Sequence, residues 1–320
     1  METMLPASRA LLACPLCRGG FLPGAADGGG LVCDAGHSFD AAKQGYINLL
    51  TGKGTVFESD SADMVAARHD FLSAGHYRLL ADAVAELAAD ALTGSGTGAA
   101  EATGDGTAES AVEGGQEDGP AILDAGTGTG HYLRAVLDRV PAAAVGLDIS
   151  KFALRRAARL NPGAANLVAD IWQPLPVRDA AVDVVTVVFA PRNAAEFARV
   201  LRPGGRLIVV TPRPGHLAEV AGTTGMLGIE PAKEERLAAG LAGHFTALPG
   251  RDVDVALDLT PDDVVKLALM GPAGHHLDRA SLDETRAGLA ARTAVTARFR
   301  ISVFTPLDRE RRQEPHPAGG

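Results

Sequence analysis

The sequence predicts an α/β protein in which a small metal-binding domain precedes a doubly wound parallel sheet. Three observations lead to this fold class. Residues 120–212 alternate short apolar stretches with stretches of helical spacing, as expected for parallel strands joined by helices. A glycine-rich turn follows the first apolar stretch. All three cysteines of the 320-residue chain lie between residues 14 and 33, close to a histidine.

The cysteine segment has the spacing Cys14-x2-Cys17-x15-Cys33-x3-His37. Each short pair turns the backbone so that two side chains face one point, and the connecting loop brings the two pairs together. This pattern predicts a zinc ribbon whose four protein ligands close the site, so that Zn²⁺ is structural there. Free buried cysteines are the alternative. A disulfide would leave one thiol over and is rare in the cytoplasm.

The composition, 46% hydrophobic and 22% charged, is that of a globular protein long enough to bury a core of its own. No apolar run approaches the roughly 18 residues of a membrane span. The N-terminus lacks the basic and apolar regions of a signal peptide. We therefore expect a cytoplasmic protein with no membrane partner.

The formal net charge of −9 comes largely from residues 93–119, which carry six acidic residues and no basic one. Small and polar residues fill the rest of this segment, so it cannot pack a core and we expect a disordered acidic linker. The remainder of the chain is near neutral. That gives no support to a strongly electrostatic nucleic-acid binder, and it does not exclude a locally basic surface.

The glycine-rich turn reads DAGTGTG at residues 124–130, between a predicted strand at 121–124 and a predicted helix at 131–140. One residue separates its last two glycines, whereas the dinucleotide fingerprint has two, so an NAD-linked dehydrogenase is the less favoured alternative. The turn resembles motif I of the class I S-adenosylmethionine (SAM) methyltransferases. Glycines there let the backbone approach the methionine and ribose of the cofactor. This resemblance implies a Rossmann-like doubly wound sheet.

The next two predicted strands end in carboxylates. Residues 142–150 predict a strand ending in Asp148, whose carboxylate can accept both ribose hydroxyls. Residues 166–172 predict a third strand ending in Asp170, which is placed to take the adenine amino group. Ligands of such sheets bind at the carboxyl ends of the strands, where these aspartates fall. A buried fourth strand is expected at 182–191, and a helix, a Pro-Gly-Gly turn and a fifth strand at 197–212.

Together the two halves resemble the 23S ribosomal RNA guanine-N1 methyltransferases of the RlmA/TlrB type. The resemblance rests on the ribbon, the glycine turn and four further segments, and it extends from the first cysteine to about residue 306. Those segments are HSFDAAKQGYINLL (37–50), DSADMVAARHDFLSAGHY (60–77), VVFAPRNAAE (187–196) and TPRPGHLAEV (211–220). FAPRN, with MGP at 270–272, is similar to the Gram-positive branch, whose members can confer resistance to tylosin-like macrolides.

This resemblance implies methyl transfer from SAM to N1 of a guanine in a 23S rRNA hairpin loop, in the hairpin 35 region near the peptide exit tunnel. Cys14, Cys17, Cys33 and His37 match the zinc ligands of the family. The cofactor set that we expect combines the strand-end residues with two that would close over SAM: Tyr77, Gly126, Gly128, Thr129, Asp148, Asp170 and His216. From the sequence alone, Tyr77 reads as a core aromatic and His216 as a surface histidine. Family members can pair, so a homodimer is one arrangement for this chain.

Catalysis at guanine N1 requires loss of a proton, and a cation near O6 would stabilise the charge that develops. The predicted loop after the fourth strand carries two candidates for contacts to the base. Phe189 could stack on the guanine, and Arg192 could be the cation near O6. Arg192 could equally be a solvated residue at a helix start. No residue stands out as the general base.

Three functions of different class fit these motifs. They are an rRNA guanine-N1 methyltransferase, a SAM methyltransferase of a small molecule or another RNA with a purely structural ribbon, and a zinc-ribbon RNA-binding protein that has lost catalysis. The intact glycine turn and Asp148 argue against the third, and the fused ribbon and long connector argue against the second. The predicted domains are a zinc ribbon at 1–52, a helical connector at 53–92, the acidic linker at 93–119, the methyltransferase domain at 120–306 and a flexible tail at 307–320.

Overall fold

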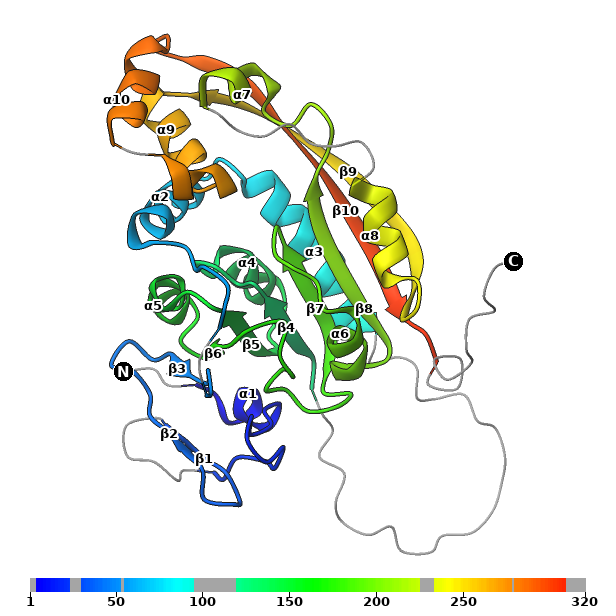
Figure 1. Cartoon of the computed structure of the whole chain (residues 1–320). Helices are drawn as coiled ribbons and strands as arrows, with labels where there is room; N and C mark the ends of the chain where they lie inside the picture. The colour runs from blue at the N-terminus through cyan, green and yellow to red at the C-terminus, as the bar shows by residue number, and fades with distance from the viewer. Residues whose placement is uncertain are drawn as a thin grey trace, which may run out of the picture.

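The computed structural model describes residues 4–23, 30–52, 55–94, 119–224, 233–277 and 279–308. An eight-stranded sheet runs through the molecule in the order β3-β6-β5-β4-β7-β8-β10-β9 (Figure 1). The first six strands of this order are parallel, and β10 and β9 form a long antiparallel hairpin at one edge. The strands are β3 (Ile47–Asn48), β4 (Ala121–Ala125), β5 (Ala143–Asp148), β6 (Ala165–Val168), β7 (Val182–Val188), β8 (Leu201–Pro212), β9 (Phe245–Leu259) and β10 (Thr293–Pro306).

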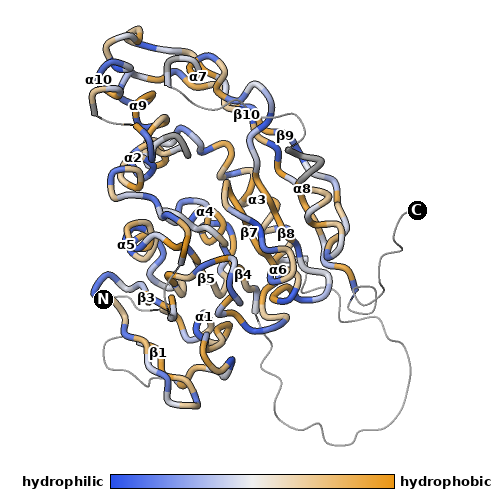
Figure 2. Tube along the Cα trace, in the orientation of Figure 1, coloured by the Kyte–Doolittle hydropathy of each residue, from blue (hydrophilic) through white to orange (hydrophobic). Residues whose placement is uncertain are grey.

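Helices cover both faces of this sheet, so the predicted doubly wound α/β class is confirmed. Side chains alternate along β4: Leu123 belongs to one apolar cluster with α6 (Ala194–Val200) and α8 (Lys233–Leu241), and Ile122 to another. The second cluster includes buried residues of α3 (Arg78–Gly94), α4 (His131–Arg139) and α9 (Pro261–Leu269). Figure 2 shows hydrophobic residues gathered along the central strands. The remaining helical elements are α1 (Pro6–Ala10), α2 (Ala62–Ser73), α5 (Lys151–Leu160), α7 (Ala218–Thr224), η2 (Pro272–His276) and α10 (Arg279–Gly288).

Local sequence explains where several elements begin. Every residue of β7 is buried, which is why valines occupy successive positions on both faces of the strand, and its two polar residues are paired: Asp183 with Arg202, and Thr186 with Asp124. Ser150 caps α5 by accepting a hydrogen bond from the backbone N–H of Ala153, and Thr260 and Asp263 form a capping box at α9. The predicted Pro-Gly-Gly turn lies inside β8 instead of before it. The register between β7 and β8 shifts at this turn: Val182 pairs with Leu201, whereas Val184 pairs with Arg206.

The N-terminal segment packs directly on the larger domain. Strands β1 (Leu31–Val32) and β2 (Ser38–Phe39) form a small antiparallel sheet, whereas β3, also within the segment predicted as the ribbon, pairs with β6. The buried hydroxyl of Ser8 in α1 donates to the carbonyl of Gly163 at 3.0 Å and accepts from the backbone N–H of Ala144 at 3.1 Å. The ribbon is therefore anchored on one face of the main sheet (Figure 1).

The predicted acidic linker falls between α3 and β4, and its residues 95–118 lie outside the described residues, as do residues 309–320 of the predicted tail. The C-terminal end of α3 and the start of β4 lie at the same end of the sheet, away from the glycine turn that follows β4 (Figure 1). No helix in the described part of the chain is long and apolar enough to cross a membrane.

Candidate functional site

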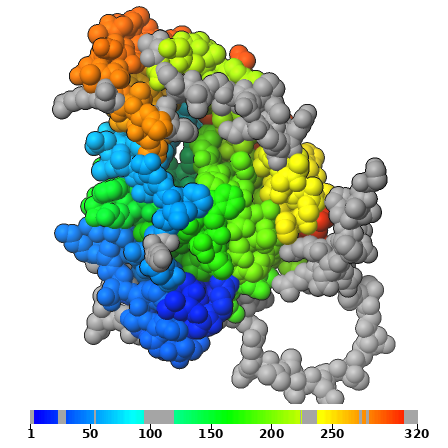
Figure 3. Space-filling model, in the orientation of Figure 1, coloured from blue at the N-terminus to red at the C-terminus, as the bar shows by residue number. Residues whose placement is uncertain are grey.

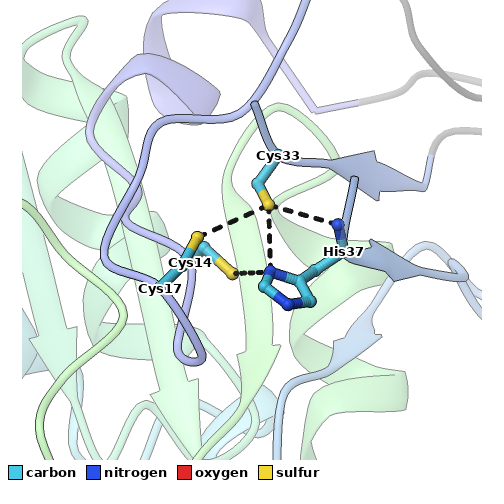
Figure 4. Close-up of side chains that lie close together, drawn as sticks. All are labelled: Cys14, Cys17, Cys33 and His37. Atoms are coloured by element: carbon cyan, nitrogen blue, oxygen red, sulfur yellow. Dashed lines mark hydrogen bonds between the residues drawn. The ribbon is translucent and has the colours of Figure 1, made fainter. Parts of the chain in front are cut away.

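Four side chains converge in the N-terminal segment, as Figure 4 shows. The Sγ atoms of Cys17 and Cys33 are 3.6 Å apart, and Nδ1 of His37 lies 3.3 Å from Cys33 Sγ and 3.6 Å from Cys14 Sγ. All four ligand atoms lie within 4.8 Å of one another. Tetrahedral Zn²⁺ with bonds of about 2.3 Å to sulfur and about 2.0 Å to nitrogen needs separations of roughly 3.5–3.8 Å. The donor set therefore fits zinc, and the sulfur atoms are too far apart for a disulfide.

The backbone around Cys33 favours its thiolate. The pKa of Cys17 is instead raised, because a backbone hydrogen bond from Gly19 lowers it less than burial and the neighbouring thiols of Cys33 and Cys14 together raise it. Burial would raise the pKa of Cys33, but hydrogen bonds from the backbone N–H groups of His37 and Ala35, and from the side chains of Cys17 and His37, lower it to about 7. The N–H of His37 lies 3.3 Å from Cys33 Sγ. Because a metal binds the deprotonated thiol, this lowered pKa helps the site to hold zinc at neutral pH.

The zinc segment is joined to the sheet through two backbone carbonyls. Arg18, which follows Cys17, donates to the carbonyl oxygens of Leu175 at 2.8 Å and Val177 at 3.2 Å. Arg199 of α6 donates to the same two oxygens at 3.1 and 2.9 Å. Glu196 forms an ion pair with Arg199 at 2.6 Å. Burial would raise its pKa, but hydrogen bonds from Arg199 and the Leu175 N–H, and the charges of Arg199 and Arg18, lower it.

The glycine turn follows β4 at the carboxyl edge, the edge where β4 to β7 end. Its three glycines all have positive φ, at +81° for Gly126, +53° for Gly128 and +83° for Gly130. A Cβ on Gly126 would stand 2.3 Å from the Cβ of Ala190, and one on Gly130 would stand 2.9 Å from the Cα of Ala157. A Cβ on Gly128 would meet only Cδ of Arg68, at 3.9 Å. Gly128 thus faces open space, so a bound cofactor could approach its backbone closely.

Asp148 ends β5 directly beside this turn. Its carboxylate accepts hydrogen bonds from the backbone N–H of Gly128 at 2.9 Å and of Ser150 at 2.8 Å. Burial raises the pKa of Asp148 to about 6, although these two hydrogen bonds oppose the shift. Nearby Asp60 raises this pKa further and Arg68 lowers it. The carboxylate is thus fixed at the strand end, where a ribose would lie.

Asp170 lies just beyond β6 and is buried. It accepts the hydroxyl of Thr55 at 2.8 Å and the backbone N–H of Trp172 at 2.9 Å. Both carboxylate oxygens therefore already have a partner. We therefore infer that Asp170 fixes the segments of Thr55 and Trp172 relative to each other, in addition to the adenine contact predicted for it.

Three predicted residues meet around a side chain that the sequence analysis did not include. The ring of Phe299 in β10 lies 5.0 Å from that of Tyr77, 5.5 Å from that of Phe189 and 4.9 Å from that of His216. The backbone N–H of Arg298 donates to Nδ1 of His216 at 3.0 Å and holds the imidazole in place. The alternation of apolar residues in 295–304 was the signal that could have identified this strand.

Tyr77 is buried, and burial raises its pKa well above the ordinary value. Thr129 is buried as well, with its hydroxyl 2.9 Å from Nδ1 of His131. The neighbouring Tyr132 hydroxyl is buried and has no hydrogen-bond partner among the described residues.

Arg68 and Asp60 were not predicted as site residues. They form an ion pair, and Arg68 also donates to the carbonyl oxygen of Met270 at 2.7 Å. The hydroxyl of Ser150 donates to the carbonyl oxygen of Asp60 at 3.0 Å. The connector therefore covers the glycine turn and ties it to α9. Figure 3 shows the same face hollowed between the cyan and orange segments on one side and the green strands on the other.

Phe189 and Arg192 follow β7 at the same edge. Phe189 has φ of +57°, a backbone conformation that costs a bulky residue about 1–3 kcal/mol and that clusters at functional sites. The residue is 47% exposed. Arg192 is half-buried, and burial lowers its pKa. Its guanidinium has no hydrogen bond or ion pair with the part of the chain that the structure describes. An unpartnered, partly desolvated cation is available for an anionic or carbonyl group of a ligand.

The structure thus gathers the predicted residues in two places. The four metal ligands lie together in the ribbon. Around the carboxyl edge lie Gly126, Gly128, Thr129, Asp148, Asp170, Phe189 and Arg192, with Tyr77 and His216 beside them through Phe299.

Comparison with known proteins agrees with this architecture. Residues 12–52 match the RlmA N-terminal zinc-ribbon family, and residues 122–205 match the family described as methyltransferase domain. The chain is 40% identical over 278 residues to the 23S rRNA (guanine(748)-N(1))-methyltransferase of Streptomyces fradiae, covering 87% of this chain and 91% of that protein. It is 44% identical over 298 residues to a Micromonospora griseorubida protein, by name a candidate 23S rRNA (guanine-N(1)-)-methyltransferase, covering 92% and 97%.

These similarities span both the ribbon and the sheet domain, and the residues present fit both zinc and SAM. The chain belongs to the family of 23S rRNA (guanine-N(1)-)-methyltransferases.

Proposed function

We propose that this protein transfers a methyl group from SAM to N1 of a guanine in a hairpin loop of 23S rRNA, in the hairpin 35 region. The observation that carries this proposal is identity of 40% or more with two members of the family over at least 87% of the chain. The presence of both the ribbon and the glycine turn supports it. An rRNA substrate agrees with the cytoplasmic location expected from the sequence.

The cofactor contacts come from the carboxyl edge. SAM, when bound, supplies a methyl group already activated by its sulfonium. Gly128, whose side faces open space, would let the backbone approach the cofactor, Gly126 lets the turn pack against Ala190, and Asp148 would accept the ribose hydroxyls. Tyr77 and His216, which both lie against Phe299, and Thr129 would hold the methionine end of SAM, and Asp170, which also binds Thr55, would hold the adenine end. These groups orient the donor, and orientation supplies much of the rate in a direct displacement.

The target base would enter next to β7. Phe189, exposed and held in a strained backbone, would stack on the guanine. Arg192 would approach O6 and stabilise the negative charge that develops as N1 loses its proton. A half-buried guanidinium acts more strongly on such charge than a solvated one, because water screens it less.

The zinc site would hold the ribbon in a fixed position on the sheet, where it offers a second surface to the RNA. Single-stranded loops present splayed bases that proteins can read, which suits two surfaces on either side of a loop. Pairing of two copies and resistance to tylosin-type macrolides are further parts of this proposal that the resemblance implies.

A methyl-transfer assay tests the proposal. The protein would be incubated with labelled SAM and a 23S rRNA fragment that contains the hairpin, and the modified position mapped by primer extension. We expect label in the RNA and a reverse-transcription stop at one guanine, because N1 methylation blocks base pairing. SAM binding without label in RNA would instead favour a small-molecule substrate.

A further inference from the structure

Two aromatic side chains lie together on the surface near the adenine side of the proposed cofactor site. The rings of Phe57 and Trp172 have centroids 6.3 Å apart and are tilted by 36°. Each residue is 47% exposed. Only 4% of the chain is aromatic, and a protein gains nothing in folding by leaving two neighbouring rings in water. Their exposure therefore points to a ligand.

One buried carboxylate holds both rings in position. Asp170 accepts the hydroxyl of Thr55 through Oδ2 at 2.8 Å, and Thr55 in turn accepts the backbone N–H of Phe57 at 3.2 Å. Oδ1 of Asp170 accepts the backbone N–H of Trp172 at 2.9 Å. The two segments are thus fixed relative to each other before any ligand arrives, and a preorganised surface loses less entropy on binding.

The charge beside this ring pair suits nucleic acid. Asn193 donates from Nδ2 to the carbonyl oxygen of Ile171 at 3.0 Å, which ties the loop of Arg192 to the residue before Trp172. Arg192 is the half-buried guanidinium that no described residue engages. The acidic neighbour Glu58 lies 3.5 Å from Nδ1 of His275, and its side chain is 81% exposed, so water screens its charge. Exposed rings next to an available arginine are the combination that binds single-stranded RNA, where bases stack and the cation meets phosphate or base.

We propose that Phe57 and Trp172 form a stacking platform for an unpaired base of the RNA loop next to the target guanine. This inference rests on the proposed function. The platform of Phe57 and Trp172 is held by Asp170, whereas the target guanine is assigned to Phe189. The platform and Phe189 would therefore stack on two different nucleotides of one loop. The ring pair would then contribute to RNA affinity and leave SAM binding and the methyl-transfer step unchanged.

Trp172 is the only tryptophan of the chain, so its fluorescence reports on the platform directly. We expect titration with the hairpin RNA to quench this fluorescence in a saturable way, and SAM alone to leave it unchanged. Quenching by SAM alone, or no quenching by an RNA that the enzyme methylates, would overturn the proposal. If RNA quenches the signal but receives no methyl group, the proposed function fails and the platform stands.

Substitutions provide the second readout. We expect Trp172→Ala and Phe57→Ala each to raise the KM for RNA by about tenfold, the range of one stacked base. Their kcat and SAM Kd should match those of the unaltered enzyme, and Trp172→Phe should restore most of the RNA affinity. Leu79→Ala is the matched control, an apolar residue on α3 that is 57% exposed and should change neither constant. A rise in SAM Kd with unchanged KM for RNA would assign the rings to adenine and contradict the proposal.

Discussion

Arg18 donates a hydrogen bond of 2.8 Å to the carbonyl oxygen of Leu175, and so links the residue that follows a zinc ligand to the loop that follows Asp170. The same guanidinium reaches Val177. Since Arg199 of α6 binds the same two carbonyl oxygens, this loop is held by both the ribbon and α6.

The first prediction concerns this link. Arg18→Ala should lower the free energy of unfolding by about 2 kcal/mol, because two charge-assisted hydrogen bonds to backbone oxygens are lost. Urea unfolding followed by circular dichroism measures the change. Arg178→Ala is the control, because Arg178 makes one exposed contact, with the carbonyl oxygen of Ala10 at 3.2 Å. An equal loss of unfolding free energy in both variants would show that the two Arg18 hydrogen bonds stabilise the protein no more than the exposed Arg178 contact does.

Zinc removal should unfold the ribbon selectively. A structural zinc site supplies about 10–16 kcal/mol of apparent binding energy, far more than the small sheet of β1 and β2 can provide. We expect Cys33→Ser to lose the metal, measured by atomic emission, and to become sensitive to proteolysis within residues 11–39. Ser38→Ala, an exposed neighbour of His37, should keep one zinc per chain. A Cys33→Ser protein with a protease-resistant ribbon would contradict the assignment.

Two glycines of one turn should respond differently to alanine. Gly126→Ala places a methyl group 2.3 Å from Ala190 at φ +81°, so we expect it to destabilise the fold by about 2–4 kcal/mol. Gly128→Ala meets no such contact, and it should cost about 1 kcal/mol of stability while lowering SAM affinity at least about tenfold. Thermal melts and calorimetric titration separate the two effects. Unchanged SAM affinity in Gly128→Ala would show that the cofactor lies elsewhere.

SAM binding should weaken in acid. Burial raises the pKa of Asp148 to about 6, and only the ionised carboxylate accepts two ribose hydroxyls. The ionised fraction is nearly complete at pH 7.5 and about one tenth at pH 5, so SAM Kd should rise about tenfold between them. The Asp148→Asn variant, measured by the same titration, should bind more weakly at pH 7.5 and lose this pH dependence. A slope that persists in the variant would point to another group.

Arg192 should act on RNA methylation and not on the cofactor. We expect Arg192→Ala to lower kcat by about 100-fold, the range measured when one donor to a developing oxyanion is removed. SAM Kd should stay unchanged. Arg192→Lys should recover part of the rate, because the charge returns without the planar fork. Unchanged turnover of the alanine variant would remove Arg192 from the scheme.

The sequence predicted the features that depend on local spacing. The metal ligands lie within a segment of 24 residues, and strands buried on both faces are rich in apolar residues, so the ribbon and β4 to β8 could be located. Asp148 and Gly128 followed from the rule for carboxyl ends. Contacts between distant segments could not be predicted in the same way. Phe299 unites Tyr77 and His216 only because β10 inserts between β8 and β9. Arg68 reaches Gly128 only after α2 has folded over the sheet.

The exit of α3 and the entry of β4 at the far end of the sheet have a consequence for how this chain can vary. Whatever joins them leaves and re-enters the domain opposite the side where methyl transfer is proposed. Changes in the length or composition of the sequence at this position should therefore carry little selective penalty on catalysis. The same position offers protein engineers a permissive point for splicing in a reporter or an affinity tag.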